Sequence, residues 1–553
     1  MIRSLLLRGG MVCDGTGAEP YPADVLVMEG RIAEVRPGIA AGEAEVLVVG
    51  GRIVAPGFID LHSHADLILP LPAPERDRLL AGRILQGITT EVVGNCGLGP
   101  APSTTASAPV LAGILSWMTP PGCSHAWPSV GAWLEEIESS RPPLNVATLL
   151  PHGSLRLAAM GLRPGPPSPG EQAVMARAAE AAFEEGAFGI STGLIYAPGM
   201  FSDTAELIGL GRIAARHRAL FTSHIRGASE LLLPAVEELL QVGRVAGCAV
   251  HHSHSEAVGR AHWNKIEAVF EAEESARRDG VAVTFDMFPY TTAATMMIAI
   301  YPPWSLEGGV PALLARLRDP ADRNRIRRDI ATVRPSWPPW NEGGWPHNLV
   351  SAVGWEGIAI SRVGSARNRA AQGLSLARLG EERSLAPFDA ISDLLVEEEG
   401  DVGMWVFEIS GDEFNDEALR RIASHPSGAF CTDAVDSGRG LPHPAAFGAF
   451  PRVLSRWVRQ TPLLTLGEAI RRMTGWPATI LGLRDRGCVR AGFHADLVVF
   501  DPATVADRAT FTDPRRPPEG IDHVFVNGSA VVRSGAYEGG SAGRVLRKPA
   551  LPA

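Results

Sequence analysis

Short apolar runs alternate with longer amphipathic stretches between residues 56 and 483. Short apolar runs are typical of buried strands, and amphipathic stretches of this length are typical of helices. The alternation predicts an α/β fold, a TIM-type (β/α)8 barrel, because neighbouring parallel strands need helical crossovers. We expect eight strands to end within residues 61–64, 90–95, 146–152, 189–196, 221–226, 250–254, 283–290 and 429–433, with helices at 172–185, 229–245, 264–278 and 465–473.

The two ends of the chain share a different pattern, in which brief strand candidates are separated by turn residues such as Gly9-Gly10. Such spacing is typical of a small β domain. The simplest arrangement is one β domain formed by residues 1–55 together with residues 484–545. Its expected strands are 5–8, 23–28, 31–35, 46–49, 495–500 and 523–528.

The gap between the seventh and eighth barrel strands is too long for one helix. Its middle is rich in proline and tryptophan, so we predict an inserted subdomain or lid at about residues 300–346. Apolar acyl groups suit aromatic and methionine surfaces, although the same side chains could simply pack the insert onto the barrel. The residues concerned are Met296, Met297, Trp304, Trp337, Trp340 and Trp345.

Composition narrows the function classes. The net charge of −10 and the pI near 5.9 argue against nucleic acid or an anionic membrane as a partner. No apolar run approaches the length of a membrane-spanning helix. Six cysteines in 553 residues do not form a disulfide framework, so we expect free thiols and a cytoplasmic enzyme. The oligomeric state stays open.

A first metal-site candidate is His62-Ser63-His64, which follows the apolar run of residues 58–61. Residues two apart on a strand point the same way, so the two imidazoles would project together from a strand end. Two such imidazoles make half of a metal site, whereas one packed and one solvated histidine is the alternative.

Four later residues can complete the site, because each falls at the end of another expected strand. They are Cys96, His224, His254 and Asp433. Taken alone, a buried cysteine is usually inert packing and a strand-end aspartate is often a helix cap. Their joint position at the C-terminal ends of barrel strands, where this fold carries its chemistry, predicts a metal centre.

At this point the sequence resembles a known group, the N-acyl-D-amino-acid deacylases of the amidohydrolase superfamily. The resemblance lies in APGFIDLHSHAD, GITTEVVGNCG, GAFGISTGLIY, TSHIR and MTGWPATILGLRDRGCVRAGFHADLVVFDP, and it covers nearly the whole chain. It implies a distorted barrel, a β-sandwich made from both termini, an inserted small domain and a small-molecule amide substrate. It also implies Zn²⁺ held by Cys96, His224 and His254, a second, weaker metal position at His62 and His64, and Asp433 as general base.

The chemistry agrees with these residue types. A catalytic zinc site accepts thiolate and imidazole and keeps one position for water. A carboxylate beside that water can take its proton and return it to the leaving nitrogen, as expected of Asp433. His152, at the end of the third strand, is a candidate for contact with the substrate, and packing is its alternative role. We therefore predict hydrolysis of a linear amide, an N-acyl bond.

The chain departs from the family where the free carboxylate of the substrate is bound. Tyr196 matches the family, whereas Glu256 stands in place of a lysine, Phe288 in place of a tyrosine and Ala445 in place of an arginine. These changes remove two cations and one hydroxyl and add an acid, which disfavours a carboxylate. We hypothesise that the substrate lacks the usual free carboxylate. The alternative is a true N-acyl-D-amino-acid deacylase in which Arg226, Arg439 or Arg452 provides the missing cation.

Two other functions remain open. The same metal centre would suit a hydrolase of cyclic amides, lactones or N-formyl amines. A non-catalytic binding protein on a decayed barrel is the alternative from another class, but decay would be expected to remove at least one ligand. All six site residues are present.

Overall fold

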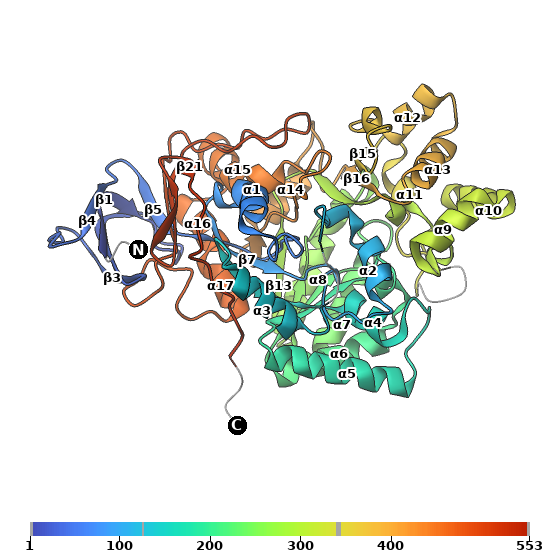
Figure 1. Cartoon of the computed structure of the whole chain (residues 1–553), viewed down its shortest axis with the longest axis horizontal. Coiled ribbons are helices and arrows are strands. Elements are labelled where there is room, and N and C mark those ends of the chain that lie inside the picture. The colour runs from blue at the N-terminus through green and yellow to red at the C-terminus, as the bar shows by residue number, and fades with distance from the viewer. Residues whose placement is uncertain (1–3, 124–126, 339–343, 550–553) are drawn as a thin grey trace.

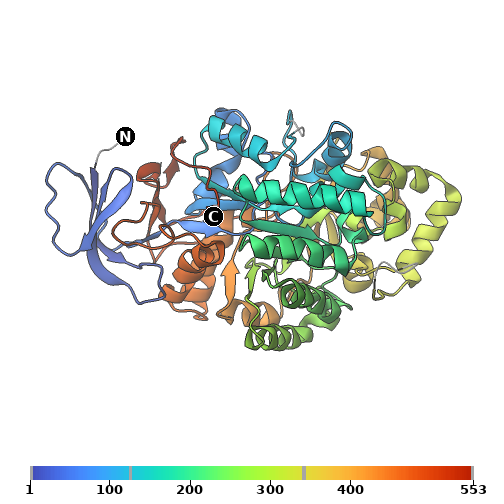
Figure 2. The same cartoon turned by 90° about the horizontal axis from the view of Figure 1, so that it is seen from below.

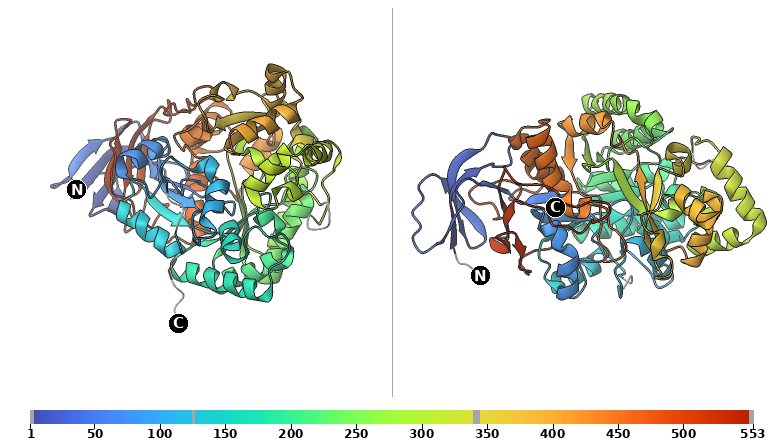
Figure 3. Two further views of the ribbon diagram at one scale, coloured as in Figure 1. Left: turned by 45° about the vertical axis from the view of Figure 1, so that its right-hand side comes forward. Right: turned by 90° about the horizontal axis from the view of Figure 1, so that it is seen from above.

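The computed structural model describes residues 4–123, 127–338 and 344–549. Figure 1 shows three parts along the longest axis: a β domain, a central parallel barrel and an inserted helical region at the far end. The two additional views in Figure 3 place the β domain and the insert at opposite ends of the barrel. No helix in the described part of the chain is both long enough and apolar enough to span a membrane.

The β domain is a nine-stranded sheet that combines the two ends of the chain. Its strands are β1 (Ser4–Val12), β2 (Tyr21–Met28), β3 (Arg31–Arg36), β4 (Glu45–Val48), β5 (Ile53–Pro56), β18 (Leu497–Phe500), β19 (Ile521–Val526), β20 (Ser529–Arg533) and β21 (Ala536–Tyr537). The two ends join where β5 pairs antiparallel with β18, with Val54 opposite Val499. Side chains such as Leu5 and Leu7 alternate into one apolar core with Leu497. The predicted assembly from both termini is present in the structure.

The barrel strands run parallel and fall at the eight expected positions. They are β6 (Phe58–Asp60), β7 (Ile88–Val93), β8 (Asn145–Thr148), β9 (Leu150–Pro151), β10 (Gly189–Gly193), β11 (Leu220–His224), β12 (Ala249–His252), β13 (Val283–Met287) and β17 (Gly428–Phe430). The third position is divided into β8 and β9 by Leu149, whose N–H donates to the carbonyl of Val93 at 2.9 Å. The Asp433 N–H donates to the carbonyl of His62 at 3.0 Å and so links the end of the last strand to the first.

Helices cover the outside of the barrel, as Figure 2 shows from below. Those of the barrel and its loops are α1 (Ala73–Ile84), α2 (Ala108–Ile114), α3 (Val130–Ser140), α4 (His152–Met160), α5 (Pro169–Glu184), α6 (Thr204–Arg216), α7 (Leu232–Ala246), α8 (Ile266–Arg278), α14 (Glu417–Ser424), α15 (Ala445–Arg452), α16 (Leu466–Met473) and α17 (Gly475–Leu481). The four predicted helices correspond to α5, α7, α8 and α16. Helix α5 begins earlier than expected because Ser168 and Glu171 form a reciprocal capping box at its N-terminus.

The insert is larger than the predicted 300–346 and has a sheet of its own. Its elements are β14 (Thr292–Met296), α9 (Gly309–Arg318), α10 (Pro320–Thr332), α11 (Leu349–Val353), β15 (Ile358–Val363), α12 (Leu376–Arg383), α13 (Pro387–Glu397) and β16 (Val402–Phe407). Strand β16 lies between β14 and β15 in antiparallel pairing. The proline- and tryptophan-rich stretch is only the first half of this region, and Trp340 lies outside the described residues.

Candidate metal centre

The structure brings all six strand-end residues together at the C-terminal end of the barrel. They are His62 and His64 after β6, Cys96 after β7, His224 on β11, His254 after β12 and Asp433 after β17. Their ligand atoms form overlapping groups of three, and within each group all atoms lie within 4.8 Å of one another. Because the strands are parallel, residues far apart in sequence reach the same end of the sheet.

Cys96 is central to this cluster. Its Sγ lies 3.6 Å from His224 Nδ1 and 3.6 Å from His254 Nε2. In a tetrahedral zinc site, bonds of about 2.3 Å to sulfur and about 2.1 Å to nitrogen would separate these atoms by about 3.6 Å. Burial raises the pKa of the Cys96 thiol to about 11, so a cation beside it is needed to stabilise the thiolate. The spacing and the donor set therefore fit a metal ion.

The backbone at the site is held in an uncommon conformation. Positive φ angles occur at Cys96 (54°), His254 (36°) and Asp433 (42°). A left-handed conformation in a residue other than glycine costs of order 1–3 kcal/mol, and such residues cluster at functional sites. Hydrogen bonds hold two of them, since the His254 N–H donates to Asp286 Oδ1 at 2.5 Å and the Asp433 N–H donates to His62.

Asp433 lies between the two histidines of the first motif. Its Oδ1 is 3.2 Å from His64 Nε2 and 3.4 Å from His62 Nε2. Burial raises the pKa of this carboxyl, but the His62 charge and the His64 hydrogen bond outweigh burial and lower it below its ordinary value. Asp433 is therefore a carboxylate at neutral pH, which is the form that a general base requires.

Asp286, on β13, contacts two histidines of the barrel strands and was not predicted from the sequence. Its Oδ2 lies 3.2 Å from His62 Nδ1 and 2.9 Å from His251 Nε2. By binding one ring nitrogen of His62, the carboxylate leaves Nε2 facing Cys96 Sγ, 3.2 Å away. The only signal in the sequence was one acidic residue inside the apolar run of residues 283–288.

A pocket opens over the candidate metal ligands. Tyr196 and Glu256, two of the residues expected to contact substrate, line it, and its other wall comes from the insert, including Thr295 and His347. The Tyr196 hydroxyl lies 2.8 Å from Thr295 Oγ1. Glu256 Oε1 is 3.6 Å from His254 Nδ1, whereas its Oε2 is buried without a hydrogen-bond partner among the described residues. Burial raises the pKa of Glu256 well above its ordinary value.

Three residues predicted to contact substrate do not line this pocket. His152 begins helix α4 and pairs with Glu206, with 2.7 Å between Nε2 and Oε1. Arg226 is fully buried, and its Nε donates to Glu238 Oε2 at 2.7 Å. Phe288 is buried against His443, with 6.4 Å between ring centroids. His152 and Arg226 are therefore each engaged by a buried glutamate, and Phe288 packs against a neighbouring ring.

A metal centre at the C-terminal mouth of a parallel barrel, with a carboxylate beside it, is built to activate water for hydrolysis. Together the fold and site define a metal-dependent hydrolase of the amidohydrolase class.

Comparisons with known proteins narrow the class. An amidohydrolase family model matches residues 415–532. Among curated proteins of Alcaligenes xylosoxydans xylosoxydans, an N-acyl-D-glutamate deacylase is 36% identical over 99% of this chain and 97% of its own length. A D-aminoacylase from the same organism is 30% identical over 99% of this chain and 98% of its own.

Solved structures agree. N-acyl-D-glutamate deacylase from Bordetella bronchiseptica, in complex with zinc and a phosphonate inhibitor, matches with a TM-score of 0.80, 33% identity and coverage of 98% of this chain and 99% of that one. The chain belongs to the N-acyl-D-amino-acid deacylase family of the amidohydrolases.

Proposed function

We propose that this enzyme is a zinc-dependent hydrolase of linear N-acyl amides and that Cys96, His224 and His254 hold the essential ion. The observation that carries the proposal is the thiol of Cys96, placed 3.6 Å from one nitrogen of each histidine. His62 and His64 would form the second, weaker position with the same thiol. Family membership supports the amide as the bond that is cleaved.

When bound, the ion lowers the pKa of its water to about 7 and polarises the substrate carbonyl. Asp433 would accept a proton from the attacking water at its carboxylate and return it to the leaving nitrogen, so one carboxylate would act first as base and then as acid. His62 and His64 each place Nε2 within 3.4 Å of Asp433 Oδ1, so the same carboxylate lies beside the proposed second metal position.

An apolar cavity beside the metal pocket is suited to the acyl group. It shares Ile195 and Tyr196 with the metal pocket and continues toward the insert. Its further lining is Ile114, Leu162, Ala197, Met296, Ile298, Ala299, Leu306, Gly309 and Val310. An aliphatic or aryl acyl chain would bury apolar surface here, at about 25 cal/mol per Å². Of the surfaces expected from the sequence, Met296 contributes directly.

The amine side of the substrate is proposed to carry no carboxylate next to the nitrogen. The described lining of the metal pocket includes no lysine or arginine. Arg226 is engaged by Glu238, and Arg452 by Asp507 and the carbonyl of Pro289. Because its pKa is raised, Glu256 repels a carboxylate less than an ionised acid would. The lack of a lysine or arginine in the described lining is therefore the stronger reason why the pocket disfavours a carboxylate.

A substrate panel tests this proposal. We expect faster hydrolysis of an N-acyl amine or N-acyl-D-amino-acid carboxamide than of the matching free acid. A strong preference for the free acid would instead identify an N-acyl-D-amino-acid deacylase. Hydrolysis of only cyclic amides, lactones or N-formyl amines would favour the alternative substrate class. The six cysteines carry free thiols, which supports a reducing cytoplasm as the compartment.

A further inference from the structure

The barrel is closed between its first and last strands mainly by side chains. In the described part of the chain, β6 and β17 are end strands of two separate sheets, so no ladder of backbone hydrogen bonds joins them. Asp433 follows β17 at this seam, and its N–H donates to the carbonyl of His62 at 3.0 Å. The position of the Asp433 carboxylate therefore depends on what holds the residues on either side of it.

Those two residues contact a single side chain. The φ angle of 42° at Asp433 lies in the left-handed region, and such a conformation persists only where the surrounding structure fixes it. Thr432 and Ala434 flank Asp433, and both are buried. Each of them contacts the guanidinium of Arg83, which belongs to the last turn of α1.

Arg83 reaches both flanks of Asp433 at once. Its Nη1 donates to Thr432 Oγ1 at 3.1 Å, and its Nη2 donates to the carbonyl of Ala434. A guanidinium is a rigid, planar fork, so these two contacts set the spacing between their two acceptors. The three-residue segment that carries the carboxylate is therefore held at both ends by one rigid group.

Two buried acids fix the guanidinium in turn. Arg83 Nη1 lies 3.3 Å from Asp60 Oδ2, on β6, and Nε lies 3.2 Å from Glu91 Oε1, on β7. Asp60 also accepts twice from Thr432, whose N–H lies 3.0 Å from Oδ1 and whose hydroxyl lies 2.6 Å from Oδ2. The four side chains form one network that crosses the seam between the first and last strands.

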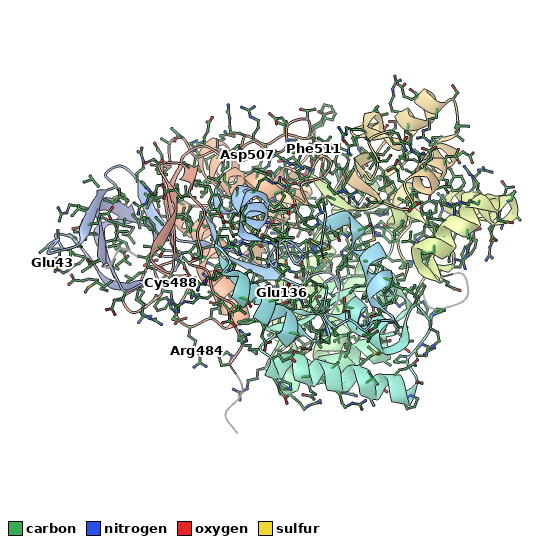
Figure 4. The ribbon with its side chains drawn as sticks, in the orientation of Figure 1. Glu43, Glu136, Arg484, Cys488, Asp507 and Phe511 are labelled. Atoms are coloured by element: carbon green, nitrogen blue, oxygen red, sulfur yellow. The ribbon has the colours of Figure 1, made fainter. Side chains whose placement is uncertain are left out.

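The depth of this network is unusual for charged groups. Arg484 shows the ordinary position of an arginine, at the lower edge of the molecule in Figure 4, whereas the Arg83 side chain is only 2% exposed. The side chains of Asp60 and Glu91 are fully buried. Buried ion pairs add little stability compared with apolar residues of the same volume. What such a network does provide is a fixed geometry, here at the segment that carries Asp433.

The helix that carries Arg83 is itself held against the chain that follows Asp433. Figure 1 shows α1 beside α15, with which it is in contact. Just beyond the end of α1, Gln86 Nε2 donates to the carbonyl of Ala445 at 3.2 Å, and its Oε1 accepts from the N–H of Phe450 at 3.3 Å. The arginine is therefore presented from a base that is fixed on both sides of the seam.

We propose that Arg83 is a positioning residue for the reaction, which orients Asp433 for proton transfer by holding Thr432 and Ala434. This role rests on the proposed function, in which Asp433 is the general base. Arg83 is not among the described residues that line the metal pocket, so it acts through the base and not on the substrate. A small displacement of a catalytic group can cost about a hundredfold in rate. The effect should therefore appear in kcat and leave KM almost unchanged.

The first test is Arg83→Lys, which keeps a positive charge beside the two acids but loses the forked contact. We expect kcat for an N-acyl amide to fall about ten- to a hundredfold and KM to change less than about threefold. Bound zinc should be retained, because its proposed ligands are unchanged. The matched control is Arg472→Lys, since Arg472 is fully buried and donates to the carbonyl of Gly428, at the other end of β17. This control should lower the melting temperature but keep kcat.

A double variant shows whether Arg83 acts through the base. In the Asp433→Asn background, Arg83→Lys should change kcat less than about twofold, because the group that it positions is already lost. An equal fall in both backgrounds would overturn the inference, and so would a loss of zinc that accounts for the fall. Normal turnover in Asp433→Asn alone would instead contradict the proposed base, so the two failures are told apart.

Thr432→Val tests the same contact if Arg83→Lys does not fold. It removes the hydroxyl that lies between Arg83 and Asp60 and keeps the branched shape of the side chain. We expect kcat to fall about three- to tenfold at constant KM, as for loss of a buried hydrogen bond, and the fall should again vanish in the Asp433→Asn background. Unchanged kcat in a folded Thr432→Val enzyme would contradict the positioning role.

A crystal structure gives an answer that does not depend on turnover. In Arg83→Lys, or in Thr432→Val, the Asp433 carboxylate should move from its place 3.2 Å from His64 Nε2, whereas Cys96 and His254 should stay where they are. An unmoved Asp433 would overturn the inference even if no amide is found to be hydrolysed.

Discussion

The barrel side and the insert side of the active site differ in how their polar groups are satisfied. On the barrel side His62, Cys96, His254 and Asp433 contact one another and Asp286 contacts His62, while His64 Nδ1 is buried without a hydrogen-bond partner in the described structure. On the insert side, the rings of His347 and Trp405 carry buried nitrogens with no hydrogen-bond partner in the described structure. A set of residues that satisfies itself is preorganised for fixed chemistry, whereas unpartnered donors are complementary to a group that the protein does not supply.

This contrast separates chemistry from specificity. The proposed metal ligands lie at the ends of parallel barrel strands, whose hydrogen-bonded pairing tolerates little change. The insert enters between β13 and β17 and approaches the same pocket through β14 and β16. Substitutions in the insert can therefore alter substrate selectivity without disturbing the metal centre. Substitutions on the two sides should have different kinetic signatures.

The largest effect is expected from removal of the shared ligand. Cys96→Ala deletes the sulfur common to both groups of metal ligands and should reduce kcat/KM at least about a thousandfold, because several kcal/mol of transition-state stabilisation depend on the ion. Elemental analysis of the purified protein should show less bound zinc. Cys248→Ala, at another buried thiol, should retain both zinc and activity. Full zinc content and full activity in Cys96→Ala would exclude Cys96 as a ligand.

The second effect separates metal binding from proton transfer. Asp433→Asn keeps the side-chain shape but loses the base, so kcat should fall by about 10²- to 10⁴-fold while tightly bound zinc is retained. Steady-state kinetics with metal analysis measures both quantities. Asp416→Asn, which only breaks a pair with Arg456, is the control. Normal turnover in the Asp433→Asn enzyme would rule out the assigned base.

The third effect concerns Asp286, whose carboxylate contacts the rings of His62 and His251. Asp286→Asn removes the charge that orients His62 and His251, so affinity for the metal should fall by about 10- to 100-fold. Competition with a chelator, followed by residual activity, gives the change in affinity. Excess zinc should restore much of the activity, in contrast to Asp433→Asn. No change in affinity would mean that Asp286 has no part in positioning the ligands.

Most of the barrel strands could be predicted from the sequence because two simple patterns determine them, short apolar runs for strands and amphipathic stretches for helices. Residues such as His224 and Asp433 end apolar runs, and parallel strands bring such ends to one edge whatever lies between them. Asp286 could not be recognised in this way, since one acid inside an apolar run says nothing about which side chains it will meet. His152 shows the reverse case, because its strand-end position was correct but its ring turns to Glu206.

The insert was harder to predict because its contacts are not local. The runs of residues 358–363 and 402–407 form its sheet, but nothing in them indicates that they pair with residues 292–296. The unusual composition of residues 301–345 therefore suggested too short a region. Arg362 is a similar case, since only the folded chain shows that it shares Asp401 with Arg439. One departure from the family pattern nevertheless pointed to this pocket, because Glu256 lines it.

The smallest effect is a change of selectivity at the boundary between the two sides. Glu256 lines the metal pocket with one buried oxygen that has no partner among the described residues, at the position where the family resemblance leads us to expect a lysine. Glu256→Lys should place a cation beside the amine side of the substrate and raise kcat/KM for an N-acyl-D-amino acid about tenfold relative to its carboxamide. Glu256→Gln removes the acid without adding a cation, so it should shift the ratio less. If both variants leave the ratio unchanged, the side chain at position 256 does not meet the substituent on the amine side, and selectivity must arise from the insert alone.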